Sequence, residues 1–168
     1  QFTNETLKEA VNFWVRNEKE AEKVHGHISN WDVSEVTNME HLFSANDDGE
    51  GDERMKNFNE DLSQWNTGKV ENMFRMFCKA SSFNSDLSSW DVSRAKNTRD
   101  MFCYAPSFNS DLSGWDVSNV ETMSGMFYGA TSFKSNLSGW DTSKCQKNMV
   151  FVFQDDSLML QEFKPKGA

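Results

Sequence analysis

The sequence predicts an α/β repeat fold: a solenoid of about four to five coils with a 25-residue period, closed at one end by an N-terminal helix. Two observations lead to this prediction. The segment SSFNSDLSSWDVS at 81–93 returns almost unchanged as PSFNSDLSGWDVS at 106–118, one period later. Residues 1–23 lack this pattern and have the apolar spacing of a helix instead. The chain of 168 residues therefore divides into a capping helix at 1–23, a repeat solenoid at 24–163 and a C-terminal tail at 164–168.

The repeat unit, read forward from each tryptophan, is W-D-V-S-x-V-x-x-M-x-x-M-F-x-x-A-x-x-F-N-x-D-L-S-x. A unit of this length cannot enclose its own apolar face, whereas stacked copies bury one continuous column in which equal positions touch. Stacked aromatic rings then add about 0.5–1.5 kcal/mol per pair beyond their burial. The positions predicted to form this structural ladder are Trp31, Trp65, Trp90, Trp115 and Trp140, with Phe77, Phe102 and Phe127.

Each part of the chain has an expected element. Residues 3–23 offer Thr3 or Asn4 as an N-cap and then an apolar stripe, so a helix should cover the open end of the first coil. In each coil the alternating D-L-S-x-W-D segment predicts one short strand of a parallel sheet. The V-x-x-M-x-x-M-F-x-x-A segment has apolar spacings of three and four, which predict a helical or 3₁₀ segment. The repeated aspartates and serines are interpreted as turn residues at the corners of the coils.

An acidic loop, 46–55, interrupts the first repeat and is the one feature that suggests an ion. Alternating oxygen ligands and a glycine at the turn are typical of calcium-binding loops. The weak candidate ligands are Asn46, Asp48, Glu50 and Asp52, but Glu53 and Asn57 stand where such loops place an apolar residue and a bidentate glutamate. A solvated acidic loop without metal is therefore the preferred interpretation, and no cofactor is expected.

Cys78 and Cys103 occupy the same slot of consecutive repeats. Equivalent residues of stacked strands lie about 4.8 Å apart, which suits a disulfide. Packed helical segments would lie about 8–10 Å apart and would not suit one. The sequence leaves the pairing open, and it predicts a buried free thiol at Cys145, which takes a valine slot.

The composition excludes several classes of protein. The formal net charge of −9 argues against general nucleic-acid binding, which needs a dense positive surface. No apolar run approaches the roughly 20 residues of a transmembrane helix. No histidine, cysteine or serine stands in a catalytic arrangement that breaks the repeat, so we expect a protein that is not an enzyme.

The repeat resembles that of the BspA-type leucine-rich repeat surface proteins, and within them the branch first noticed in mycoplasma lipoproteins. WDVSNVETMSGMFYGATSF at 115–133 matches the signature of that branch nearly letter for letter, and the resemblance extends strongly over 24–145. It implies a leucine-rich-repeat-like solenoid and a role in adhesion or protein binding at a cell surface. The departures are local: Ala95 and Thr98 replace a valine and a methionine, and Lys134 and Asn136 replace an asparagine and an aspartate.

Function is expected in the variable slots, because a repeat scaffold presents its differences there. A partly basic line and several aromatic residues expected to face outward could form a binding face for a protein partner. The alternative interpretation is an ordinary solvated surface with no binding role. These candidates are Lys69, Phe74, Arg94, Lys96, Arg99, Tyr104, Tyr128 and Lys144.

The expected function is therefore a non-enzymatic protein-interaction scaffold. One alternative is an accessory subunit docked permanently on a larger organellar or membrane assembly. A second alternative is a cell-surface adhesin that binds a glycan or a host protein. The resemblance favours a secreted or cell-surface location, with an organellar complex as the alternative.

Overall fold

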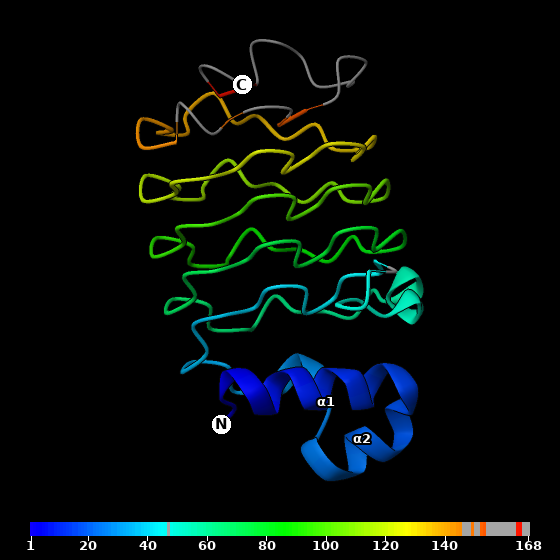
Figure 1. Ribbon diagram of the computed structural model, residues 1–168. Helices are drawn as coiled ribbons and strands as arrows, with labels where there is room; N and C mark the ends of the chain where they lie inside the picture. Colours follow the sequence, from blue (N-terminus) through cyan, green and yellow to red (C-terminus); the bar gives the residue numbers. More distant parts are fainter. Residues whose placement is uncertain (47, 146–148, 150–151, 154–163, 166–168) are drawn as a thin grey trace.

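The computed structural model describes residues 1–46, 48–145, 149, 152–153 and 164–165, so the end of the predicted repeat region and most of the predicted tail lie outside the described residues. The chain forms a column of stacked coils with two short helices at its N-terminal end (Figure 1). No helix in the described part is long and apolar enough to span a membrane. The helical elements of that part are α1 (Asn4–Arg16), α2 (Glu18–His25), η1 (Ile28–Asn30) and η2 (Glu53–Asn57).

The predicted α/β class, and with it a leucine-rich-repeat-like solenoid built on a parallel sheet, is wrong. The described residues contain no β-strand, and their only β-type pairings are isolated parallel bridges that join Asn38, Asn72, Asn97 and Thr122 in successive coils. The D-L-S-x-W-D segments, predicted as strands, form turns. The M-x-x-M-F segments, predicted as helical, are runs of consecutive turns.

The coils are joined by a backbone hydrogen-bond ladder that is neither helix nor sheet. In the second coil every other N–H group crosses to the next coil, as from Arg75 to the carbonyl of Arg99 at 3.0 Å. The N–H groups between them turn back three residues, as from Cys78 to the carbonyl of Arg75 at 3.1 Å. Because half of the donors leave the coil, the segment cannot be a helix, and because the other half turn back, it cannot be a strand. Apolar spacings of three and four fit both a helix and this arrangement.

This ladder requires left-handed backbone at two slots of the repeat. The first slot holds His41, Arg75, Asp100 and then Gly125, and the second holds Lys79, Tyr104 and then Gly129; all of these have φ between 51° and 74°. Left-handed conformation costs a residue with a side chain about 1–2 kcal/mol. In the coils before the fourth, residues with side chains adopt this conformation in spite of the cost. The fourth coil has glycine at both slots and avoids it.

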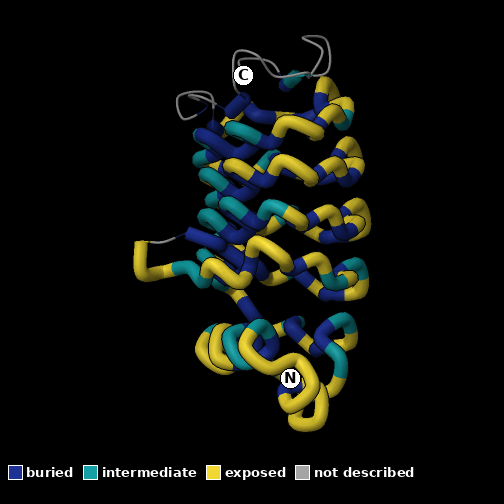
Figure 2. The backbone as a smooth tube through the Cα atoms, turned by 90° about the vertical axis from the view of Figure 1, so that its right-hand side faces the viewer, coloured by how far each residue is buried: buried dark blue, intermediate teal, exposed yellow. Residues whose placement is uncertain are grey.

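Two columns of phenylalanine rings fill the core. Phe43, Phe77, Phe102 and Phe127 stack with ring centroids 5.3, 5.6 and 5.7 Å apart and nearly parallel planes. A second column interleaves with it at centroid distances of about 4 Å and consists of Phe58, Phe83, Phe108 and Phe133. Buried residues recur at the same places in successive coils (Figure 2).

The tryptophans of the repeat anchor each coil to the one before it. The indole N–H of Trp90 donates to the carbonyl of Leu62, that of Trp115 to Leu87 and that of Trp140 to Leu112, each at 2.9 Å. Trp65 and Trp31 make the corresponding bonds near the N-terminal end, to the carbonyls of Ile28 and Gly26. These indoles are nearly fully buried, so the bonds remove what would otherwise be unpaired donors in the core.

The N-terminal cap consists of two helices, whereas the sequence predicts one helix over 3–23. Asn17 breaks it: its backbone is not helical, it ends α1, and its side chain accepts a hydrogen bond from the Glu20 N–H at 3.3 Å to start α2. The N-cap of α1 is Thr3, with a reciprocal capping box to Thr6. The buried face of α1 consists of Leu7, Ala10, Val11 and Trp14.

The repeated aspartates close the corners of the coils. Each carboxylate accepts a hydrogen bond from the backbone N–H of the serine two residues later. The hydroxyl of that serine and this N–H together lower the pKa of the aspartates. The aspartates with such a bond are Asp32, Asp61, Asp86, Asp91, Asp111, Asp116 and Asp141.

The corner aspartates predict a loss of stability in acid. A carboxylate with a lowered folded-state pKa contributes stability above its unfolded pKa, and the contribution is lost as the pH falls through the folded value. Ser118→Ala removes the hydroxyl that donates to Asp116 at 2.6 Å and keeps the backbone donor. We expect the free energy of unfolding of this variant to depend less on pH than that of the unmodified chain between about pH 5 and pH 2. Urea denaturation followed by tryptophan fluorescence measures this, and identical pH profiles would contradict the assignment.

Gly129 predicts a second effect on stability. Its φ is 74°, and a Cβ at this position would lie 2.6 Å from Cδ1 of Tyr104. Gly129→Ala should therefore lower the free energy of unfolding by about 1–2 kcal/mol. Gly139→Ala is the matched control, because no atom lies within 4 Å of the added Cβ and its backbone is not left-handed. Equal stability of the two variants would show that the left-handed slot does not constrain the chain.

Candidate functional site

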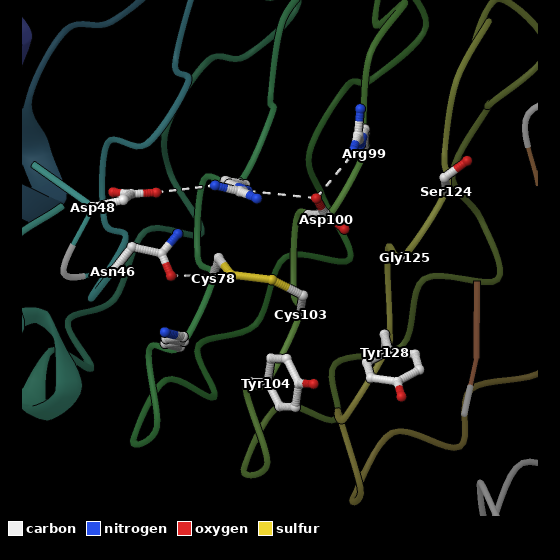
Figure 3. A pocket seen from close by; sticks show the side chains of 12 residues that line it. Asn46, Asp48, Cys78, Arg99, Asp100, Cys103, Tyr104, Ser124, Gly125 and Tyr128 are labelled. Carbon is white, nitrogen blue, oxygen red and sulfur yellow. Dashed lines mark hydrogen bonds and ion pairs between the residues drawn. A yellow bond between two sulfur atoms is a disulfide. The ribbon is translucent and has the colours of Figure 1, made fainter. Parts of the chain in front are cut away.

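An open groove of about 860 Å³ lies along the ladder side of the column, and four successive coils contribute to it (Figure 3). Its lining draws mainly on the slots with left-handed backbone and on the residues beside them. These lining residues are Asn46, Asp48, Arg75, Cys78, Lys79, Arg99, Asp100, Cys103, Tyr104, Ser124, Gly125 and Tyr128. The ladder therefore determines which side chains face the groove.

A chain of alternating charges crosses the groove. Arg75 lies between two carboxylates, 3.0 Å from Asp48 and 3.4 Å from Asp100, and Arg99 lies 3.5 Å from Asp100 (Figure 3). The guanidinium groups of Arg75 and Arg99 also lie 5.1 and 5.8 Å from the centroid of the Phe74 ring. Phe74 therefore positions the two arginines. More than half of the Arg99 side chain remains exposed.

Two tyrosines form an aromatic wall of the groove. Tyr104 is 50% exposed, although its φ of 51° is a strained conformation for an aromatic residue. Its ring lies over Gly129, whose missing side chain leaves the space. Tyr128 meets Tyr104 edge to face at a centroid distance of 5.5 Å. The left-handed backbone of Tyr104 thus places a large aromatic side chain at the surface.

A disulfide joins Cys78 and Cys103 beneath these side chains, with Cα atoms 4.7 Å apart. Neighbouring coils lie this close because the backbone ladder joins them directly, so the helical separation considered for this slot does not occur. The Oδ1 atom of Asn46 lies 3.7 Å from the Cys78 sulfur. The bridge fixes the second coil to the third where Arg75 and Asp100 meet.

The basic line predicted from the sequence lies apart from the groove, except for Arg99. Lys69 pairs with Glu35 at 2.5 Å and Lys96 with Glu71 at 2.7 Å, each one coil back. Lys144 bonds to Asn119 in the same manner. Arg94, Lys96 and Lys144 line a smaller hollow with Glu71, Asn119 and Glu121. The eight predicted binding residues therefore divide into a groove set and a set outside it. The groove set consists of Arg99, Tyr104 and Tyr128, which line the groove, and Phe74, which contacts Arg99. The other set consists of Arg94 and the paired Lys69, Lys96 and Lys144, and exposed pairs of this kind contribute little to stability.

The acidic loop does not assemble the oxygens considered for calcium. Asp48 pairs with Arg75, Glu50 with Lys8 at 3.6 Å, and Asp52 with Arg54 at 2.7 Å. Asn46 is buried, with its Oδ1 atom facing Cys78 of the next coil. Within the residues that the structure describes, no group of three or more His, Cys, Asp or Glu side chains could hold a metal ion.

His27 and Cys145 have structural surroundings. The Nδ1 atom of His27 accepts a hydrogen bond from the Ser29 N–H at 3.3 Å and so caps η1. Cys145 is buried with its thiol directed at the carbonyl of Thr142, 3.4 Å away. Burial raises the pKa of this thiol, so it stays protonated at neutral pH.

The sequence did not identify Asp48, Arg75, Lys79, Asp100 and Gly125 as groove residues. A usable signal exists for one pair: Arg75 and Asp100 have opposite charge and stand one period apart, and residues one period apart meet between coils. The glycines at 125 and 129 give a weaker signal, since both stand where earlier coils carry large side chains.

A family model described as "Mycoplasma protein of unknown function, DUF285" matches residues 15–102 and 52–164 of the chain. Together the two matches cover well over half of the sequence. No curated protein and no solved structure matches.

The disulfide predicts a measurable contribution to stability. Replacing both Cys78 and Cys103 with serine opens a loop with a sequence separation of 25. The free energy of unfolding should fall by about 3 kcal/mol, because the unfolded chain regains loop entropy. Urea denaturation with and without a reductant checks this: the reductant should shift the midpoint of the unmodified chain and leave that of the double variant unchanged. A reductant-insensitive unmodified chain would contradict the bridge.

Proposed function

The chain belongs to the DUF285 family, and we propose that it is a non-enzymatic binding module that takes a protein partner in the groove. The observation that carries the proposal is Tyr104, an exposed aromatic residue held in left-handed backbone beside Arg99. Strained conformations cluster at functional sites, and tyrosine and arginine are enriched among residues that dominate protein interfaces. The ladder imposes left-handed backbone at this slot, and the slot nevertheless holds a large exposed aromatic side chain where the next coil has Gly129.

The rigidity of the groove supports the same proposal. Its walls come from coils that are joined by the backbone ladder, by the Cys78–Cys103 bridge and by the Arg75–Asp100 ion pair. A preorganised surface loses little side-chain entropy on binding, which leaves more of the contact energy as affinity. The groove also offers both donors and acceptors, since arginine and aspartate side chains alternate along it.

The disulfide supports an oxidising setting for this module. Disulfides persist at cell surfaces, in secreted proteins and in comparable compartments, and they are rare in the reducing cytosol. This favours a surface or secreted module over a cytosolic one, and it is also compatible with a subunit on the oxidising side of an organellar membrane.

The proposal predicts that the groove set, and not the basic line, determines capture of a partner. The intact protein is cross-linked to its neighbours in source material, and the captured proteins are quantified by mass spectrometry for each variant. Tyr104→Ala and Arg99→Glu should each reduce capture of one partner by at least about tenfold, as expected for residues that dominate an interface. Lys69→Ala, which removes a paired cation outside the groove, is the matched control and should leave capture unchanged.

The readout separates the alternatives. Thermal unfolding of each variant first establishes that the column remains folded. Loss of capture in Lys69→Ala but not in Tyr104→Ala would overturn the groove as the binding surface. Retention of a glycan, with no protein captured through the groove, would assign the module to carbohydrate binding instead and would also overturn the proposal.

A further inference from the structure

Asn136 departs from the residue type of its slot without any structural need. Three coils carry D-L-S at this corner, with Asp61, Asp86 and Asp111, whereas the fourth carries N-L-S at 136–138. The turn is the same in both cases. Asn136 Oδ1 accepts a hydrogen bond from the Ser138 N–H at 3.0 Å, as Asp111 does from the Ser113 N–H at 3.0 Å. The asparagine therefore keeps the corner and exchanges a carboxylate oxygen for an amide nitrogen.

That exchange creates the pattern N-x-S, in which asparagine is the acceptor for N-linked glycans. We propose that Asn136 is an N-glycosylation site. The donor class is an oligosaccharide linked through a diphosphate to a membrane lipid. The bond between the sugar C1 and the diphosphate oxygen breaks, and a bond between C1 and Asn136 Nδ2 forms. The amide loses one proton to the transferase, and the lipid diphosphate leaves.

The surroundings of Asn136 are suitable for such a modification. The residue is exposed, and within the described part of the chain no acceptor is bonded to its Nδ2 atom. The Ser138 hydroxyl donates to Oδ1 at 2.7 Å, so the two side chains that define the pattern are already in contact. Leu137 between them is fully buried and holds the corner in place. A glycan on Nδ2 would extend into solvent without displacing a core contact.

The disulfide is an independent observation that points the same way. The Cys78–Cys103 bridge forms in the oxidising compartments that secreted chains pass through, and those compartments also carry out N-glycosylation. None of the residues that line the groove comes from the D-L-S or N-L-S corners. The glycosylation proposal therefore stands or falls separately from the partner-binding proposal.

A second N-x-S/T pattern, N-E-T at 4–6, provides a structural contrast. Asn4 Oδ1 accepts from the backbone N–H groups of Thr37 and Asn38 at 2.9 and 3.2 Å, and its Nδ2 donates to Thr37 Oγ1 at 3.2 Å. These bonds tie α1 to the first coil. A glycan on Asn4 would break them, so Asn4 should remain unmodified in the folded protein.

The decisive measurement uses the protein isolated from its source. Trypsin releases residues 135–144 as one peptide, which contains a single asparagine, and Asn4 lies in the peptide that ends at Lys8. The 135–144 peptide should carry a glycan, and enzymatic removal of the glycan should leave aspartate at position 136. The peptide with Asn4 should be found without a glycan. A 135–144 peptide found only with unmodified asparagine would overturn the proposal.

Variants of the full chain, directed into the secretory pathway of a eukaryotic host, test whether Asn136 itself is the acceptor. Asn136→Asp restores the residue of the other coils and should abolish the mass shift that glycosidase removes, and Ser138→Ala should do the same. Asn4→Gln, the matched control, should leave the shift unchanged. Asp111→Asn creates N-L-S at the equivalent corner and should add a second glycan. A mass shift that survives Asn136→Asp, or that disappears in Asn4→Gln, would overturn the assignment.

Discussion

The backbone ladder between coils is the constraint on which the rest of this structure depends. Alternate N–H groups cross to the next coil while the others turn back three residues, so the chain advances in short turns and neighbouring coils stay close. This spacing permits the stacking of phenylalanine rings, the Cys78–Cys103 bridge and the ion pair between Arg75 and Asp100. It also imposes left-handed backbone at two slots, and the side chains at those slots form much of the groove. Core and candidate site are therefore consequences of one hydrogen-bond pattern.

The period, the stacked phenylalanine slots and the aspartate corners could be predicted, because each depends only on equal residues recurring at equal spacing. The conformation within each coil could not. Methionine and phenylalanine at spacings of three and four are as compatible with these turns as with a helix. Arg75 and Tyr104, which have left-handed backbone, belong to residue types that carry no sequence signal for it. The break at Asn17 escaped prediction because the capping side chain acts locally, within a segment whose other residues are compatible with one continuous helix.

The candidate site was predictable only in part. Tyr104, Tyr128 and Arg99 could be named, since large variable residues on a repeat are visible in the sequence. Their separation from Lys69, Lys96 and Lys144 could not, because it depends on which glutamate or asparagine each lysine meets one coil back. Because each of these lysines bonds to a side chain of the neighbouring coil, the line of positive charge seen in the sequence consists largely of paired groups. The charge that remains available near the groove is mainly that of Arg99, which is held over Phe74 and only loosely paired with Asp100.

The indole bonds have an implication for how such a chain can change in length. Donor and acceptor are always a tryptophan N–H and a backbone carbonyl 28 residues earlier in the coils of Trp90, Trp115 and Trp140, so neither partner is peculiar to its own coil. Excision or duplication of a whole unit would therefore leave every interior indole matched, whereas extra residues keep the match only if they leave the column, as they do between Ile28 and Trp65. The first repeat accommodates its extra residues by looping them out beside the column, before Phe58 rejoins its stack. The column itself should accordingly lengthen or shorten by whole units, with any other extra residues placed in loops beside it.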